Sequence, residues 1–293
     1  EIVGTLELGA IPDFSHKSET GHYSYRRLSG GNNGSNGKVD NSLPVVLSAP
    51  KSPAAEALRA VYAQLVYLFH QNGGPRHITL GITSSWAREG KTTIAANLGC
   101  VFSRFGYKTL IVDADLNRAG LSKALGATQG PGLVDYLMGD AGFEDVIKTV
   151  EGAGLSIIST GHSSYEVPSL LASPSFADFI ARCRKEYECV LVDVPPVLPV
   201  ADVTLVAGVL KDFIVVVRSD AVTPAELDQA ATILRQVGGR IKGVVLNAVD
   251  HSTKYGPYRY GYYYYYGYGS DGARSRKSRE GVVNAGLPKS SGN

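Results

Sequence analysis

A short polar loop followed by a helix-like segment carries the clearest chemistry in this sequence. The run Ser84–Thr93, SSWAREGKTT, follows an apolar segment at 78–83 and is termed the phosphate loop. Backbone N–H groups in such a loop and the positive end of the next helix surround phosphate oxygens. Lys91 would reach the β- and γ-phosphates, and Thr92 would offer its hydroxyl to Mg²⁺. We therefore predict a nucleoside triphosphate site, although Ser85 replaces the first glycine of the G-x-x-x-x-G-K-[ST] pattern.

Three aspartates stand where two other apolar segments end. Asp113 and Asp115 close the run 109–115, TLIVDAD, and Asp193 closes 189–193, CVLVD. An aspartate after a buried strand can hold Mg²⁺ directly or through water, and an unpaired charge there is otherwise costly. Asp115 alone could also be a helix N-cap. Because the three occur together, metal and proton chemistry explains them better.

The elements that must position these residues alternate between two types. Apolar, β-branched runs indicate strands covered on both faces, and segments of helical periodicity lie between them. This alternation predicts an α/β fold with a doubly wound, mostly parallel sheet that binds ligands at the carboxyl ends of its strands. The charged stretch 144–148 is expected to be a solvated helix face. The expected strands are 78–83, 109–113, 155–159, 189–194, 213–218 and 243–249, and the expected helices are 91–105, 174–187, 201–210 and 224–237.

Composition narrows the class of protein. The chain has 293 residues, 44% hydrophobic residues and a net charge of +2, so no nucleic-acid partner is expected. Its three cysteines lie in or beside apolar runs, as buried thiols in a reducing compartment do. No apolar run approaches the ~20 residues that span a bilayer, and no signal peptide opens the chain. We expect a soluble protein, and the initial Glu1 suggests a fragment of a longer one.

Changes in composition divide the chain into three parts. Residues 1–51 contain a strand-like start at 1–12 and a Gly/Asn/Ser linker at 28–42. Residues 52–250 form the expected P-loop domain, which opens with a helix after Ser52-Pro53. Residues 251–293 are polar and Tyr/Gly-rich and then basic, so we expect disorder there.

Nine of the 17 tyrosines fall in this last part. Glycines between them would let a flexible tail present one hydroxyl after another to an active site. The tail could instead be a low-complexity segment that self-associates or stacks on nucleic acid or sugar. The candidate phosphoacceptors are Tyr255, Tyr258, Tyr260, Tyr262, Tyr263, Tyr264, Tyr265, Tyr266 and Tyr268.

Together these features resemble the bacterial protein-tyrosine kinases, a P-loop family that accompanies capsule and exopolysaccharide export. The resemblance covers roughly residues 52–268. It combines the phosphate loop, a Walker A′-like IVDADL at 111–116, a Walker B-like LVDVPPV at 191–197 and the tyrosine cluster. No single element is decisive, but the combination is specific.

The resemblance implies roles for individual residues. Lys91, Asp113 and Asp115 would be catalytic, with Asp113 as the base that takes the tyrosine proton. Thr92, Asp115 and Asp193 would order Mg²⁺ and its waters. The residues implied for ATP binding are Ser85, Glu89, Gly90, Lys91, Thr92 and Thr93, with Asn247 on the adenine.

The resemblance also implies partners and a place in the cell. Members form rings through a Glu-x-x-Arg-x-x-Arg helix, of which Glu56 and Arg59 are present while Tyr62 replaces the last arginine. A transmembrane chain-length regulator, fused or separate, and a protein-tyrosine phosphatase would be partners at the cytoplasmic face of the bacterial inner membrane. Residues 1–51 would then be a juxtamembrane-like segment and flexible linker, since LGAIP at 8–12 is similar to the segment just past the second membrane span of fused members. Further departures from the family are Trp86 and Arg88 in the loop and Asn117-Arg118-Ala119 after Asp115.

The function expected from these patterns is an ATP-dependent tyrosine autokinase that modifies its own tail in trans and regulates polysaccharide export. A positioning ATPase of the same fold is the first alternative, although Trp86 occupies the place of the second lysine that such proteins carry. A catalytically weak interaction module that only binds nucleotide is the other.

Overall fold

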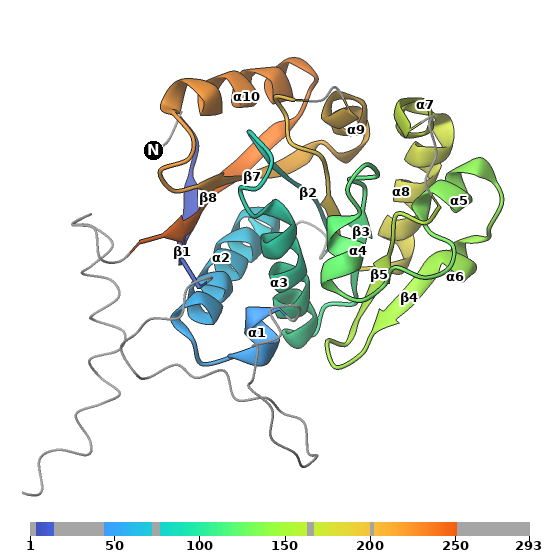
Figure 1. Cartoon of the computed structure of the whole chain (residues 1–293), viewed down its shortest axis with the longest axis horizontal. Helices are drawn as coiled ribbons and strands as arrows, with labels where there is room; N and C mark the ends of the chain where they lie inside the picture. The colour runs from blue at the N-terminus through green and yellow to red at the C-terminus, as the bar shows by residue number, and fades with distance from the viewer. Residues whose placement is uncertain (1–3, 15–43, 72–76, 163–166, 200–201, 251–293) are drawn as a thin grey trace, which may run out of the picture. The chain divides into compact units, whose positions relative to one another are not determined.

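The computed structural model describes residues 4–14, 44–71, 77–162, 167–199 and 202–250. Within these ranges one sheet has the strand order β1-β8-β7-β2-β6-β3-β5-β4 (Figure 1). Every neighbouring pair is parallel except β4 with β5. The strands are β1 Glu7–Pro12, β2 Ile78–Ser84, β3 Thr109–Asp113, β4 Ile147–Val150, β5 Leu155–Ile158, β6 Cys189–Asp193, β7 Asp212–Arg218 and β8 Arg240–Val249.

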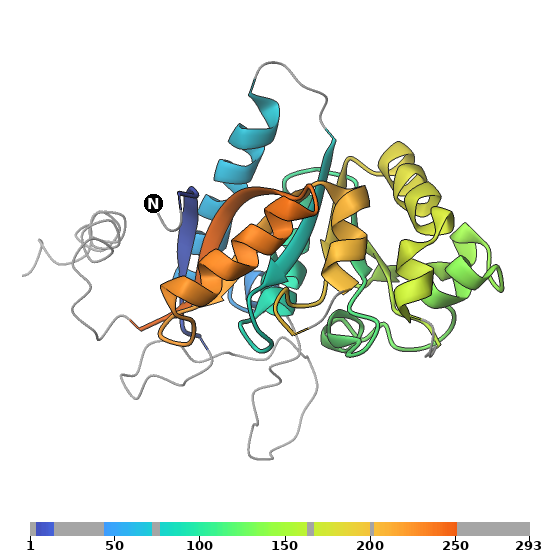
Figure 2. The ribbon, with the colours of Figure 1, turned by 90° about the horizontal axis from the view of Figure 1, so that it is seen from above.

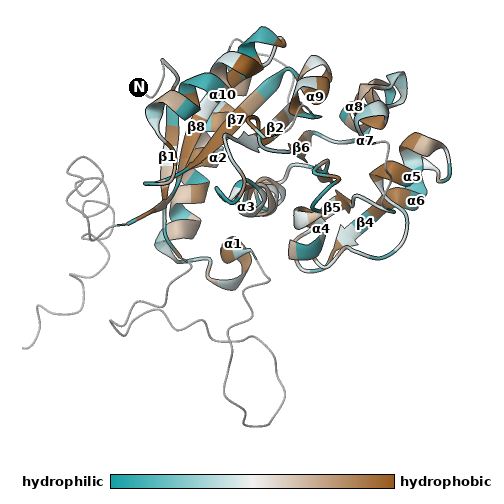
Figure 3. Ribbon diagram, turned by 45° about the horizontal axis from the view of Figure 1, so that its top comes forward, coloured by the Kyte–Doolittle hydropathy of each residue, from teal (hydrophilic) through white to brown (hydrophobic). Residues whose placement is uncertain are grey.

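The central strands are buried along their whole length. Every residue of β2, β3 and β6 is buried, as strands rich in apolar and β-branched residues are expected to be (Figure 3). β2 and β3 both pair with β6, so the carboxyl ends of these three strands lie side by side. The doubly wound sheet expected from the sequence is confirmed, and all six expected strands are present.

Helices pack against both faces of the sheet (Figure 2). α2 and α3 contribute Leu65 and Phe102 to one core, whereas α8 and α10 contribute Phe179 and Leu234 to the other. The four expected helices agree with α3, α8, α9 and α10 to within one residue at each end. The helices are α1 Val45–Ser48, α2 Pro53–His70, α3 Lys91–Arg104, α4 Gly120–Ala124, α5 Leu133–Met138, α6 Phe143–Val146, α7 Val167–Ala172, α8 Pro174–Glu186, α9 Asp202–Leu210 and α10 Pro224–Gln236. Among the described helices, none combines the length and the hydropathy that a bilayer crossing requires.

The first strand belongs to the same sheet as the phosphate loop. β1 pairs in parallel with β8, and Leu8 and Ile11 are buried in one core with α2. β1 thus packs with the domain that is expected to begin at residue 52, and the described residues up to 250 belong to one compact unit. The expected linker at 28–42 and the tail at 251–293 lie outside the described residues.

The expected helix face at 144–148 is wrong in its second half. The single turn α6 ends at Val146, and Lys148 lies in β4, opposite Ile157 of β5. Asp145 accepts a hydrogen bond from the Gly142 N–H at 3.0 Å, which caps the short helix. The β-branched residues that follow then favour a strand, which closes one edge of the sheet.

Candidate nucleotide site

The phosphate loop joins β2 to α3 and is shaped around one glycine. Gly90 is the N-cap of α3 and has φ of 95°, a left-handed conformation that favours glycine. A Cβ atom at this position would come within 2.1 Å of the Asn247 side-chain nitrogen. That nitrogen donates a hydrogen bond to the Glu89 carbonyl oxygen at 2.8 Å. Asn247, at the end of β8, therefore lies directly against the loop.

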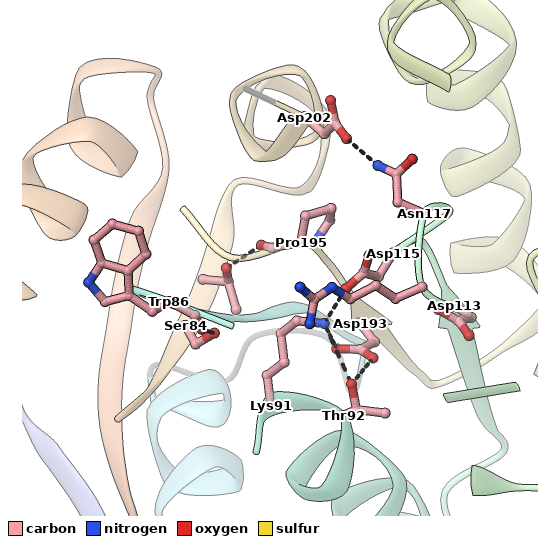
Figure 4. A network of polar contacts seen from close by, with 12 residues as sticks. Ser84, Trp86, Lys91, Thr92, Asp113, Asp115, Asn117, Asp193, Pro195 and Asp202 are labelled. Atoms are coloured by element: carbon pink, nitrogen blue, oxygen red, sulfur yellow. Dashed lines mark hydrogen bonds and ion pairs between the residues drawn. The ribbon is translucent and has the colours of Figure 1, made fainter. Parts of the chain in front are cut away.

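Lys91 joins the two acidic strand ends. Its Nζ lies 2.7 Å from Asp115 Oδ2 and 3.3 Å from Asp193 Oδ1 (Figure 4). Thr92 Oγ1 donates a 2.7 Å hydrogen bond to Asp193 Oδ2. All but Thr92 are buried. The structure thus brings together the four residues that the sequence assigned to phosphate and magnesium.

Burial and charge act in opposite directions on these groups. Burial lowers the pKa of Lys91, but the carboxylates of Asp193 and Asp115 outweigh it, so the net shift is upward. Burial raises the pKa of Asp193 to about 7, against the opposing effect of Lys91. A second cation close to Asp193 would favour its charged form further.

Asp113 has different partners from the other two aspartates. Its Oδ2 accepts hydrogen bonds from the Ser122 backbone N–H at 2.8 Å and the Ser122 hydroxyl at 2.7 Å. Its Oδ1 is buried and has no hydrogen-bond partner among the described residues. Burial raises the pKa of this carboxyl, although the bonds from Ser122 oppose the shift. Lys91 is thus bound to two of the three aspartates, and Asp113 is held by Ser122, which the sequence analysis missed.

The Glu89 side chain holds the loop instead of facing the nucleotide cavity. One carboxylate oxygen accepts the Trp86 backbone N–H, and the other accepts the Arg218 backbone N–H at 3.1 Å. Burial raises its pKa despite these bonds. Ser85 is also buried, and its hydroxyl has no hydrogen-bond partner among the described residues. Trp86 is exposed, and its ring nitrogen donates to Glu226 Oε1 of α10 at 3.0 Å.

A cavity of about 410 Å³ lies in front of the loop. We call it the phosphate-loop cavity. Segments far apart in the chain line it: the loop itself, the turn after β3, the ends of β7 and β8, and the residues that follow β1. The sequence analysis did not assign Pro12, Asp13, Phe14 or Arg218 to the site. Pro12, Asp13 and Phe14 reach the cavity because β1 pairs with β8, and Arg218 reaches it because β7 also pairs with β8. No sequence motif indicates these positions. The lining residues are Pro12, Asp13, Phe14, Ala87, Arg88, Gly90, Lys91, Thr92, Thr93, Asp115, Arg118, Gly120, Pro196, Arg218, Asn247 and Ala248.

The residues assigned to ring formation interact within the chain. Arg59 binds Glu56 at 2.6 Å and donates to the Pro50 carbonyl oxygen at 2.6 Å. Tyr62, which replaces the family arginine, stacks on Phe105 with ring centroids 4.5 Å apart. Ring assembly through Glu56 and Arg59 remains a prediction.

Comparison with curated proteins gives relatives with one recurring description. The chain is 32% identical over 218 residues to "Putative tyrosine-protein kinase EpsB" of Ralstonia nicotianae, which covers 72% of this chain and 29% of that protein. It is 27% identical to "Putative tyrosine-protein kinase CapB" of Staphylococcus aureus, over 72% of this chain and 92% of that protein. It is 30% identical to "Succinoglycan biosynthesis transport protein ExoP" of Rhizobium meliloti, over 72% of this chain and 28% of that protein. The aligned part thus spans less than a third of EpsB and ExoP.

Solved structures agree on the fold. The kinase domain of Escherichia coli tyrosine kinase ETK matches with a TM-score of 0.73 and 24% identity, over 85% of this chain and 92% of that one. The septum site-determining protein MinD complexed with Mg-ADP from Pyrococcus horikoshii matches with a TM-score of 0.52 and 27% identity, over 60% of this chain and 71% of that one. The resemblance to bacterial tyrosine-kinase domains is confirmed. The model of the CobQ/CobB/MinD/ParA nucleotide-binding domain matches residues 82–259. The chain belongs to this family of P-loop nucleotide-binding domains.

Proposed function

We propose that this chain is an ATP-dependent protein-tyrosine kinase domain that phosphorylates the tyrosines of its own C-terminal tail in trans. One observation carries the proposal. A lysine, a threonine and two buried aspartates lie within hydrogen-bond distance of one another, as a phosphate and magnesium site requires, and a third buried aspartate has one oxygen without a partner among the described residues. Positioned charges of this kind are what phosphoryl transfer requires from a protein.

The residues present fit a magnesium nucleotide. Mg²⁺ usually takes one or two carboxylates, with phosphate oxygens and waters as its other ligands. Thr92, Asp115 and Asp193 would hold the ion, which supplies charge neutralisation to the β- and γ-phosphates. No group of three or more His, Cys, Asp and Glu side chains in the described part of the chain could hold a metal by itself. Phosphate oxygens are therefore expected to complete the site.

The proposed transfer combines the phosphate loop with Asp113. Lys91 and the loop N–H groups hold the triphosphate, and Ser122 fixes one oxygen of Asp113. The other oxygen of Asp113 accepts the proton of the tyrosine hydroxyl. The tyrosine oxygen bonds to the γ-phosphorus while the bond from that phosphorus to the β,γ-bridging oxygen breaks, and ADP leaves. Asn247, which lines the cavity at the end of β8, would contact the adenine.

The relatives support the wider biological setting. EpsB and CapB carry the name tyrosine-protein kinase, and ExoP is named for succinoglycan biosynthesis transport. We propose that the chain regulates capsule or exopolysaccharide export at the cytoplasmic face of the inner membrane. A transmembrane chain-length regulator, a tyrosine phosphatase and further copies of the chain are the proposed partners.

Mass spectrometry of the purified chain after incubation with ATP and Mg²⁺ tests the proposal. Phosphate should appear on the nine tail tyrosines and be absent in Asp113→Asn and Lys91→Met. Transfer in trans predicts that an Asp113→Asn chain is labelled by a second chain whose tail tyrosines are all phenylalanine.

Two outcomes would overturn the kinase assignment. ATP hydrolysis without phosphotyrosine would favour a positioning ATPase, which the match to MinD makes the second candidate. ATP binding with neither hydrolysis nor transfer would indicate a nucleotide-binding interaction module.

A further inference from the structure

Arg88 occupies a backbone conformation that suits a different residue. It lies in the turn of the phosphate loop with φ of 70°, in the left-handed region. A side chain with a Cβ atom is strained there, whereas glycine is not. Strained backbone at a ligand-binding loop persists where the side chain or the local geometry is needed. The geometry of the turn alone therefore does not explain why an arginine occupies this position.

The position of Arg88 supplies that reason. Its side chain is exposed, and the residue lines the phosphate-loop cavity beside Gly90 and Lys91. With the described residues its guanidinium makes no hydrogen bond or ion pair, whereas Lys91 is bound to two carboxylates. An arginine offers several N–H donors in a planar fork that matches phosphate oxygens.

We propose that Arg88 is a nucleotide-binding residue that contacts the polyphosphate of the bound nucleotide through its side chain. This inference rests on the proposed function for the identity of the nucleotide, but it requires only binding and no transfer. Arg88 adds a movable positive charge at the cavity mouth to the fixed charge of Lys91 at its base. The backbone of Arg88 is strained because a residue with a long cationic side chain occupies a conformation that favours glycine.

Lys211 provides a matched control. It has φ of 69°, almost the same as Arg88, is basic and exposed, and lies directly before β7, outside the cavity lining. Replacing either residue with glycine relieves the same kind of strain and adds the same freedom to the unfolded chain. A difference in nucleotide binding between the two variants therefore comes from the place of the side chain.

Isothermal titration calorimetry with ATP and with AMP, in Mg²⁺, tests the proposal on wild type, Arg88→Gly, Arg88→Lys and Lys211→Gly. Arg88→Gly should bind ATP about tenfold more weakly, since a hydrogen bond to a charged group is lost. It should keep its AMP affinity and melt at the same temperature as wild type or up to about 3 °C higher. Arg88→Lys should keep most of the ATP affinity, and Lys211→Gly all of it.

Three results would overturn the assignment. Arg88→Gly could bind ATP as tightly as wild type, Arg88→Lys could be as weak as Arg88→Gly, or AMP could lose as much affinity as ATP. A wild-type chain that binds no ATP would overturn both this inference and the proposed function. A chain that shows the Arg88 dependence but transfers no phosphate would overturn the proposed function alone.

Discussion

Two buried ion pairs of Lys91 stabilise the base of the phosphate-loop cavity, and removing one of their partners should lower the free energy of unfolding. Lys91 neutralises Asp115 and Asp193, and removing it leaves two buried carboxylates without a cation. Breaking a buried pair by removing one partner costs roughly 3–5 kcal/mol, more than the pair itself contributes. The same lysine is therefore expected to affect folding as well as the proposed binding of ATP.

Lys91→Met is accordingly expected to reduce the free energy of unfolding by about 3 kcal/mol and to abolish ATP binding. Urea denaturation without nucleotide measures the first effect. Lys185→Met, at an exposed position near the end of α8, is the control and should change stability by less than about 0.5 kcal/mol. Equal midpoints for the two variants would contradict the prediction.

At this scale the sequence predicts residue types better than contacts. Lys91, Thr92, Asp115 and Asp193 lie together as the motifs predict, because motif spacing fixes their relation to a strand end and a helix start. The partner of Asp113 could not be predicted, because Ser122 comes near it only through the turn that leads into α4.

A residue in the left-handed conformation shapes the turn that leads from β3 into α4. Ala119 is the N-cap of α4 and has φ of 50°. Proline fixes φ near −65°, so a proline at position 119 could not adopt the observed turn. The turn between β3 and α4 must therefore differ from that of a chain with proline at this place.

Ala119→Gly should stabilise the chain by up to about 1 kcal/mol, since glycine adopts this conformation without strain. Ala119→Pro should instead lower the stability of the chain and displace Ser122, which lies in α4 and binds Asp113. The melting temperatures of both variants show whether each substitution raises or lowers the stability of the chain. A proline variant as stable as wild type would contradict the assigned turn.

Asp135 joins the start of α5 to the residues after β5. Its carboxylate accepts the Gly132 N–H at 2.7 Å and the His162 N–H at 3.2 Å, and it lies 2.5 Å from His162 Nδ1. Burial raises the pKa of Asp135, but these donors outweigh it, so its pKa lies below the ordinary value of 3.8. The folded chain thus holds this proton less tightly than the unfolded chain does.

The stabilisation from Asp135 should be complete above about pH 4 and disappear as the pH falls through the lowered pKa. Asp135→Asn should therefore lower the free energy of unfolding by about 1–2 kcal/mol at pH 7 and by progressively less below pH 4. Chemical denaturation across this range measures the difference. A cost that is independent of pH would show that the carboxylate charge is not what stabilises the contact.

The whole molecule depends on a close approach between its first and last described strands. A Cβ atom at Gly243 of β8 would lie 2.4 Å from Leu8 Cγ and 2.9 Å from the Leu6 carbonyl oxygen. β1 thus packs where β8 has no side chain. Because Pro12 and Phe14 line the cavity, the same packing shapes the nucleotide site.

Gly243→Ala should destabilise the chain by about 1–3 kcal/mol through overpacking. Gly208→Ala, in α9 with open space around its Cβ position, should be neutral or stabilise by up to about 1 kcal/mol. Urea midpoints of the two variants provide the comparison. A Gly243→Ala chain as stable as Gly208→Ala would mean that β1 is not packed on β8 in solution.

At this largest scale, alternation of strands and helices was enough to predict a parallel sheet, but not its complete membership. β4 was missed because its four residues follow a one-turn helix and carry charge. β1 was recognised as strand-like but assigned outside the domain, because a flexible-looking stretch separates it from α2. Pairing across such a distance in sequence leaves no local pattern.

The chain contains a single tryptophan, and it lies in the phosphate loop. Trp86 is exposed, its backbone is held by Glu89, and its ring contacts Glu226 of α10 (Figure 4 shows its place relative to Lys91). Indole emission responds to the polarity and hydrogen bonding around the ring. The unlabelled protein therefore carries an optical reporter at the loop, free of background from other indoles, which can time loop movement in a stopped-flow experiment.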